Sequence, residues 1–208
     1  MQQLDVIKPR FEFRTFGYSL QEEHTRMQKL SDPVSEELKE RKSEETYIIS
    51  YRNDLHNIKI RDDKLDIKKL IQSVENFEQW KPVIKVGFPI SFDIMKNDIF
   101  PALLVELPSI NSETFSISDL IQIVDTHPEL QAVNVKKRRF GYLVNNAICE
   151  VAEVIINNKK VMTISVESTE INLIKKTIRD LGIDNFENIN YLQAIKRIIG
   201  MIDLPLAN

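Results

Sequence analysis

Charge at alternate positions of strand-like segments is the feature that most restricts what this chain can fold into. Such segments occupy residues 11–14, 58–61, 65–68, 83–86 and 135–139. A β-strand sends successive side chains to opposite faces, so each segment would have one apolar face and one charged face. One strand of this kind fits an ordinary sheet that is packed on one side and solvated on the other. Five strands whose charged faces are mostly Lys and Arg favour a curled sheet that encloses a cationic space.

The links between these segments indicate antiparallel neighbours. Three strands are expected near residues 46–51, 57–61 and 64–71, and three longer ones at 130–144, 147–156 and 161–167. Only a few polar residues separate consecutive strands in each group, whereas a parallel return needs a dozen residues or more. We therefore predict an α+β fold, in which about eight strands form a closed antiparallel β-barrel, or tunnel, with helices packed outside it.

The remaining segments predict helices around this sheet. Helical patterns cover residues 20–30, 33–42 and 75–80, and two further helices are expected between residue 168 and Gly200. Residues 90–129 are expected to form two helices around an apolar strand at 102–107. Forty residues could hardly support a core alone. We therefore expect one domain over residues 1–208, with 90–129 as a peripheral helical insertion.

The overall charge narrows the classes of partner. The chain has 208 residues and a net charge of −3, which argues against a protein coated in basic residues for duplex nucleic acid or an anionic membrane surface. No apolar stretch approaches the length needed to cross a bilayer, and the first residues do not resemble a signal peptide. We therefore expect a cytoplasmic protein. The sequence does not indicate its oligomeric state.

Two common sites are absent from the sequence. The five glycines leave no phosphate-binding glycine-rich loop, so any phosphate must be held by side chains. The lone Cys149 lies among apolar residues and is expected to be a buried thiol, and the three histidines lack the spacing of a metal site.

Basic side chains on one face of the expected strands form the candidate binding site. The set comprises Arg14, Lys59, Arg61, Lys68, Lys85, Lys137 and Arg139. Cations inside a barrel are costly unless water, acids or an anion compensate them. Glu12, Glu150 and Glu167 lie on the same strands. Carboxylates among phosphate-binding cations commonly hold Mg²⁺ or Mn²⁺, but these three could equally form ion pairs with the basic residues.

The order of these motifs resembles the CYTH superfamily, the triphosphate tunnel metalloenzymes. This superfamily includes class IV adenylate cyclases, thiamine triphosphatases and inorganic triphosphatases. Residues 11–14 are similar to the family's N-terminal ExExK strand, and 57–61 with 65–68 to its LRIR and TLK strands. Residues 137–142 resemble its KxRxxY strand, and 161–181 its ExE strand with the following helix. The resemblance covers most of the chain outside residues 90–129.

The resemblance implies an eight-stranded antiparallel tunnel. Its basic side chains would bind a triphosphate, and its carboxylates would hold one or two divalent ions, with Mg²⁺ or Mn²⁺ as the cofactor. Three positions depart from the family pattern. Arg10 replaces the first Glu of ExExK, Ser165 replaces a Glu of ExE, and residues 85–89 lack the family's RxExE. The basic residues of this chain therefore match the family's phosphate-binding pattern better than its acidic residues match the metal-binding pattern.

Two functions follow from this reading. The first is a metal-dependent phosphohydrolase or cyclase that acts on a triphosphate-bearing small molecule, whether a nucleoside, thiamine or inorganic triphosphate. The alternative is a catalytically weak or inactive module that binds nucleotide or polyphosphate. A third possibility is a structural scaffold whose tunnel charges are paired with one another. None of these hypotheses identifies a catalytic residue, and the sequence does not separate hydrolysis from cyclisation.

Overall fold

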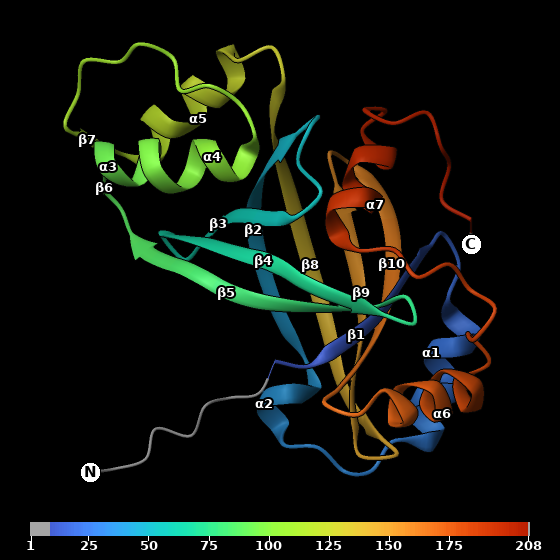
Figure 1. Cartoon of the computed structure of the whole chain (residues 1–208). Coiled ribbons are helices and arrows are strands. Elements are labelled where there is room, and N and C mark those ends of the chain that lie inside the picture. The colour runs from blue at the N-terminus through green and yellow to red at the C-terminus, as the bar shows by residue number, and fades with distance from the viewer. Residues whose placement is uncertain (1–8, 208) are drawn as a thin grey trace, which may run out of the picture.

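A closed antiparallel barrel organises the chain. The computed structural model describes residues 9–207, and its eight barrel strands pair in the order β1-β10-β9-β8-β2-β3-β4-β5 (Figure 1). The strands are β1 (Phe11–Gly17), β2 (Arg41–Ser50), β3 (His56–Arg61), β4 (Lys64–Val74), β5 (Phe77–Gly87), β8 (Leu130–Val144), β9 (Ala147–Ile156) and β10 (Lys159–Ser168). Pairing of β1 with β5 closes the ring. The predicted α+β barrel is confirmed.

Tight turns set the register of the barrel. Four hairpins turn on two residues that both have positive φ: Asp62-Asp63, Glu75-Asn76, Asn145-Asn146 and Asn157-Asn158. Left-handed conformation at both central residues is the mark of type I′ turns, whose twist matches that of the flanking strands. Asn and Asp tolerate this conformation better than most other residues. These turns therefore fix the register at the start of each hairpin, although the β4–β5 pair shifts its register twice farther along.

Helices cover two outer faces of the barrel. α1 (Gln21–Leu30) and α6 (Ile171–Leu181) pack through Met27 and Ile178 on outward side chains such as Phe13. Residues 90–129 cover the outer face of β3 and β4 instead. They contain β6 (Ile90–Ser91), α3 (Phe92–Ile94), a π-helix (Met95–Ile99), α4 (Phe100–Leu103), β7 (Thr114–Phe115) and α5 (Ile117–Thr126). Figure 1 shows this group, in green and yellow-green, beside one end of the barrel.

α7 (Tyr191–Ile198) has a different position, because it packs against inward-facing residues. Its side chains Leu192, Ile195 and Ile198 join a buried cluster with Phe16 and Val154, which are both on the inner face. One end of the barrel is therefore filled by an apolar core. α7 lies near the upper end of the barrel in Figure 1, and the short α2 (Glu36–Lys39) lies near the lower end.

Three local predictions were wrong. The helix expected over residues 33–42 is limited to α2, because residues from Arg41 onward pair with β8. Residues 75–80, expected to be helical, form the β4–β5 turn and the start of β5. The strand expected at 102–107 overlaps α4 instead. In the first two cases strand pairing across the barrel overrides a local helical pattern. Among the described residues, no helix is long and apolar enough to span a membrane.

Candidate functional site

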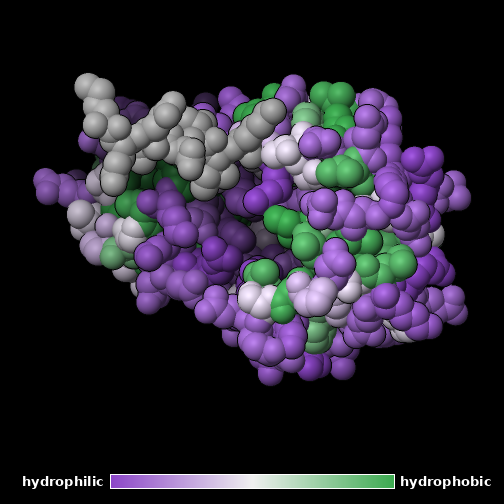
Figure 2. Space-filling view, turned by 90° about the horizontal axis from the view of Figure 1, so that it is seen from below, coloured by the Kyte–Doolittle hydropathy of each residue, from purple (hydrophilic) through white to green (hydrophobic). Residues whose placement is uncertain are grey.

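The hollow half of the barrel holds a cavity of about 820 Å³ lined by charged side chains. Seen from the side away from α7, the molecule is visibly hollowed (Figure 2). All seven basic residues selected from the sequence line this cavity: Arg14, Lys59, Arg61, Lys68, Lys85, Lys137 and Arg139. Arg41 lines it too, as do Glu12, Asp66, Glu150 and Glu167. The lining therefore has twice as many cationic as anionic side chains, although the whole chain carries a net charge of −3.

Two tyrosines form the inner end of this cavity. Tyr47 and Tyr191 line it and also belong to the buried cluster around α7. Lys137 Nζ lies 3.7 Å from the centre of the Tyr191 ring, and the Arg14 guanidinium lies 4.9 Å from it. Lys59 Nζ is 5.7 Å from the centre of the Tyr47 ring. Aromatic faces attract cations. Because the two tyrosines form the inner end of the cavity, the cations that contact them, Arg14, Lys59 and Lys137, are the innermost ones.

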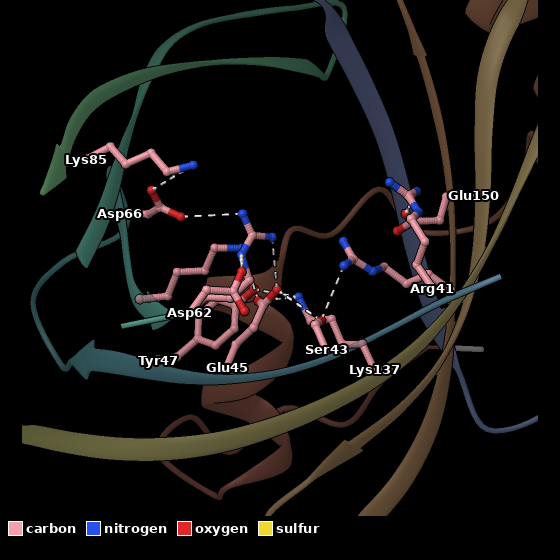
Figure 3. A network of polar contacts seen from close by, with 12 residues as sticks. Arg41, Ser43, Glu45, Tyr47, Asp62, Asp66, Lys85, Lys137 and Glu150 are labelled. Atoms are coloured by element: carbon pink, nitrogen blue, oxygen red, sulfur yellow. Dashed lines mark hydrogen bonds and ion pairs between the residues drawn. The ribbon is translucent and has the colours of Figure 1, made fainter. Parts of the chain in front are cut away.

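Glu45 anchors these cations and was not among the residues selected from the sequence. Its carboxylate is fully buried and accepts hydrogen bonds from Lys137 (2.9 Å), Lys59 (3.0 Å) and Arg61 (3.5 Å). Figure 3 shows this carboxylate at the centre of a network that extends to Asp66 and Lys85. The strand expected near residues 46–51 begins after Glu45, so nothing in the sequence indicated that this side chain faces the cavity.

Burial and neighbouring charges shift the pKa values of Lys137, Lys59 and Glu45. Burial lowers the pKa of Lys137 to about 7, although Glu45 beside it acts in the opposite direction. Burial also lowers the pKa of Lys59. For Glu45, burial alone would raise the pKa, but Lys137 and Lys59 outweigh it and hold the pKa well below its usual range. Glu45 therefore stays ionised, while Lys137 titrates near neutrality.

Two arginines that line the cavity have unused donors. Arg41 and Arg139 lie directly opposite one another in the register of β2 and β8. Arg41 donates to Glu150 Oε2 (3.1 Å) and Arg139 to Ser43 Oγ (3.3 Å). The Nε–H group of each arginine is buried and has no hydrogen-bond partner within residues 9–207. Like charges directly opposite one another are unfavourable, so this pair is suited to an anion between or beside the two guanidinium groups.

The three glutamates selected as metal ligands lie in the cavity, but each contacts an arginine. Glu12 pairs with Arg14, Glu150 with Arg41 (3.1 Å), and Glu167 with Arg10 (4.0 Å). No three His, Cys, Asp or Glu side chains in the described part of the chain are grouped so that they could hold a metal ion. The ion-pairing that the sequence left open is thus present for all three glutamates.

Glu12 nevertheless lies in a row of acids. It is directly opposite Glu167 on β10 and Glu78 on β5. Burial raises the pKa of Glu167, and the charge of Glu12 raises it further. The pKa of Glu78 is raised for the same two reasons, against hydrogen bonds from Asn190 and Trp80 that lower it. Glu78 was missed from the sequence because residues 75–80 were expected to be helical. A cation near this row would relieve the repulsion.

Residues 31–40 lie over the rim of the cavity. Pro33, Val34, Ser35 and Leu38 line it. Gly141 on β8 allows this approach, since a Cβ atom there would lie 2.7 Å from the carbonyl oxygen of Leu38. The segment is also held by Arg138, which donates to both carboxylate oxygens of Glu40 (2.8 and 3.3 Å). Part of the rim is therefore built by a segment outside the barrel strands.

Comparison with known proteins identifies the fold. No protein-family model and no curated protein matches the sequence significantly. A structure named "putative adenylate cyclase" from Bacillus halodurans is similar with a TM-score of 0.50 and 11% identity, over 88% of this chain and 94% of that chain. A conserved hypothetical protein from Pyrococcus furiosus gives a TM-score of 0.49 and 17% identity, over 88% and 98% of the two chains.

A plant protein is also similar. It is the "putative adenylyl cyclase" of Hippeastrum, whose name reports a dominant triphosphatase activity, and it gives a TM-score of 0.48 and 14% identity over 96% of this chain and 99% of that chain. Identities this low show a common fold and nothing finer. The chain has the eight-stranded antiparallel tunnel that its strand motifs predict, and it shares this fold with the Bacillus halodurans structure.

Proposed function

We propose that this protein binds the triphosphate group of a small molecule in the barrel cavity and acts on it as a phosphohydrolase or cyclase. The opposed pair Arg41 and Arg139 carries the proposal. Both guanidinium groups have a buried N–H group without a partner among the described residues. A buried charged donor without a partner is costly, and a phosphate oxygen would satisfy both donors at once. Arginine also suits phosphate through its planar set of N–H groups.

The surrounding cations support a ligand with several phosphates. Lys59, Lys137 and Arg61 contact the Glu45 carboxylate, and Arg61 also contacts Asp62 and Asp66. The eight cations that line the cavity still outnumber its carboxylates, so their combined charge is only partly neutralised. Lys68 and Lys85 add charge on β4 and β5. Such an arrangement is suited to an extended polyanion rather than to a single phosphate. The Bacillus halodurans protein that shares the fold is named as a cyclase, which agrees with a triphosphate ligand.

The acids fit a divalent ion only in part. Mg²⁺ is usually bound through one or two carboxylates together with phosphate oxygens and water. Glu12 and Glu167 are hard oxygen ligands on neighbouring strands and oppose each other directly, so they fit one side of such an ion. Glu150 would join them only if it left Arg41. We therefore propose Mg²⁺ or Mn²⁺ as the cofactor, recruited together with the triphosphate. When bound, the ion would neutralise charge on the phosphoryl group.

The alternative is a module that binds triphosphate or polyphosphate without turnover. The observation that favours it is that Arg14, Arg41 and Arg10 each contact one of the three glutamates. An arginine in contact with a carboxylate competes with a metal ion for its oxygens. Both functions require the same anion in the same cationic cavity. They differ in whether the glutamates also hold a metal ion that supports turnover.

One experiment separates these functions and tests their common basis. Tripolyphosphate binding is measured by calorimetry, and phosphate and pyrophosphate release is measured with ATP, thiamine triphosphate, tripolyphosphate and long-chain polyphosphate, with and without Mg²⁺ or Mn²⁺. Metal-dependent release supports the enzyme. Binding without release on any substrate supports the binding module. Absence of tripolyphosphate binding would refute both.

A cation on the outer face of the same strand provides the control. Arg139→Met removes a lumen cation with an unused donor, and Lys136→Met removes an outward cation that lies exposed beside Glu44. We expect Arg139→Met to weaken tripolyphosphate binding by about tenfold, the loss of one charge-assisted contact. Lys136→Met should leave the affinity unchanged. Equal effects of the two substitutions would argue against a site inside the barrel.

A further inference from the structure

An open groove of about 1110 Å³ lies outside the barrel, between one side of α5 and the segment that leaves β5. Figure 1 shows α5 within the 90–129 group, above the end of β5 from which the chain enters β6. The Phe88 N–H donates to the carbonyl oxygen of Asp63 (3.2 Å), so the end of β5 and the β3–β4 turn form one wall. None of the residues that line this groove lines the barrel cavity.

The floor of the groove is apolar. Phe88, Ile117 and Ile121 are half-buried, because each packs on the core beneath residues 90–129 and also lines the groove. Ile117 and Ile121 are four residues apart and therefore lie on the same side of α5. The exposed Pro89 lines the groove as well. An apolar strip between a helix and an opposing wall is the form of a site that receives an amphipathic helix.

The charged residues that line the groove are both acidic. They are Asp63, from the barrel side, and Asp125, from α5. Both are exposed, and neither forms an ion pair or a side-chain hydrogen bond with any residue between 9 and 207. Asp125 lies in the last turn of α5, which has no basic residue. The negative end of the helix dipole adds to its charge there. A basic group is therefore the missing counter-charge on each side of the groove.

A second copy of the chain does not supply such a group. α1, α6 and α7 already bury their apolar faces against the barrel, through side chains such as Met27, Ile178 and Ile195. α2, α3 and α4 are about one turn long. Two grooves placed face to face would oppose acids to acids, which is unfavourable. The occupant is therefore a segment of another protein.

We propose that this groove binds an amphipathic helix of a partner protein. The apolar side chains of that helix would cover Phe88, Ile117 and Ile121. Its lysine or arginine side chains would lie beside Asp63 and Asp125. This inference goes beyond the proposed function and does not rest on it, because the groove and the barrel cavity share no lining residue.

Two helical model peptides test this assignment on the full chain. The first has a leucine stripe and lysines on its polar face, and the second has glutamate in place of every lysine. Affinities are taken from the NMR shifts of isoleucine methyl groups, so that binding elsewhere is not counted. We expect the Leu/Lys peptide to shift Ile117 and Ile121 and to bind there about tenfold more tightly than the Leu/Glu peptide. It should leave Ile148, which lines the barrel cavity, unchanged.

Variants with matched charge locate the site. Gln122→Arg adds a cation at an exposed position in the groove and should weaken binding of the Leu/Lys peptide by about tenfold. Ser109→Arg adds the same charge at an exposed position of the 90–129 group outside the groove and should leave the affinity nearly unchanged. A thermal melt of each variant controls for folding.

A charge reversal tests the selectivity. Asp63→Asn combined with Asp125→Lys should reverse the preference in favour of the Leu/Glu peptide. Asn is chosen at position 63 because this residue has a φ of 54°, which Asn tolerates.

Four results would overturn the inference. The first is no binding of the Leu/Lys peptide, and the second is binding that Gln122→Arg and Ser109→Arg weaken equally. The third is equal affinity of the two peptides at Ile117 and Ile121, which would show that the acids do not select the occupant. The fourth is self-association of the protein in sedimentation that Gln122→Arg abolishes, which would assign the groove to a second copy. Each of these results leaves the proposed function standing, since tripolyphosphate binding is measured separately.

Discussion

Lys137 donates a hydrogen bond of 2.9 Å to Glu45 at the inner end of the cavity, and the side chains of this ion pair are 4% and 0% exposed. Lys137 also donates to the Tyr47 hydroxyl (2.7 Å). A buried ion pair seldom adds net stability over a well-packed apolar pair, but it fixes the geometry of the charged groups. Glu45 is thus suited to holding Lys59 and Lys137 beside the cavity when no anion is bound.

The first prediction concerns this anchor. Glu45→Gln keeps the shape of the side chain but leaves Lys59, Arg61 and Lys137 without their shared carboxylate. Removing one partner of a buried ion pair leaves uncompensated charge, so we expect the free energy of unfolding to fall by about 3 kcal/mol. Urea denaturation measures this change.

Glu44 provides the control for this prediction. It is the preceding residue on β2, and its side chain is 60% exposed beside Lys136. Glu44→Gln should leave the urea midpoint nearly unchanged, because exposed ion pairs contribute little. If tripolyphosphate restores the stability of Glu45→Gln, the anion replaces the missing carboxylate. Equal stability of the two variants without ligand would contradict the anchoring role.

The second prediction is a dependence of binding on pH. The pKa of Lys137 is about 7 in the free protein, and the charged groups around it are Glu45, Lys59 and Arg14. A bound phosphate would favour the charged amine and raise this pKa. The complex then holds more protons than the free protein above pH 7, so affinity for tripolyphosphate should fall as pH rises from about 7 to about 9.

Calorimetry in buffers of different ionisation enthalpy checks this directly, because binding at pH 8 should take up protons from the buffer. Lys137→Met should abolish the part of the proton uptake that belongs to this residue, and Lys136→Met should retain it. Proton uptake that is the same in both variants would assign the pH dependence to another group.

The sequence predicts the strands of the barrel better than it predicts which side chains line the cavity. Strand β8 was located at its observed bounds, because alternating charge and the Asn145-Asn146 turn are local signals. Whether a charged side chain faces the cavity depends on closure of the whole ring. Glu45 therefore looked no different from Glu44 beside it, although the first is buried and the second is exposed.

Long-range pairing explains the other omissions. Arg41 was assigned to a helix because residues 33–42 have a helical pattern, but it pairs with Arg139 across the sheet. Likewise, the sequence predicts a helix from Asn190 to Gly200, where the structure has α7 at Tyr191–Ile198, yet nothing in its own pattern indicates that it packs on the inner face of a barrel. An amphipathic helix shows which of its faces is buried but not what covers that face.

The third prediction concerns the rim. At Gly141, an added Cβ atom would lie 2.7 Å from the Leu38 carbonyl oxygen, whereas at Gly87 it would meet nothing within 4 Å. Gly141→Ala must therefore displace residues 31–40 or β8, at a cost of about 1–3 kcal/mol. Gly87→Ala should be nearly neutral. Urea denaturation compares the stabilities, and limited proteolysis reports exposure of residues 31–40. Similar behaviour of the two variants would show that α2 does not rest on Gly141.

The last prediction separates the metal from the anion. Glu167 lies opposite Glu12, and burial together with the Glu12 charge raises its pKa. A group whose pKa is raised in the folded state contributes stability at low pH that is lost as pH rises through that pKa. Glu167→Gln replaces the carboxyl group by an amide that does not ionise, so this stability is not lost as pH rises. The variant should therefore be at least as stable as the wild type at pH 7. Urea denaturation at that pH makes the comparison.

The same substitution should abolish metal-dependent turnover, because Glu167 is one of the two opposed carboxylates proposed to hold Mg²⁺ or Mn²⁺. Tripolyphosphate affinity without metal should stay within about twofold of the wild type, since lysines and arginines bind the anion. Glu153→Gln, at a half-exposed outward position beside Arg138, is the control and should retain turnover. A folded Glu167→Gln variant with full metal-dependent activity would refute the assignment of Glu167 to the metal.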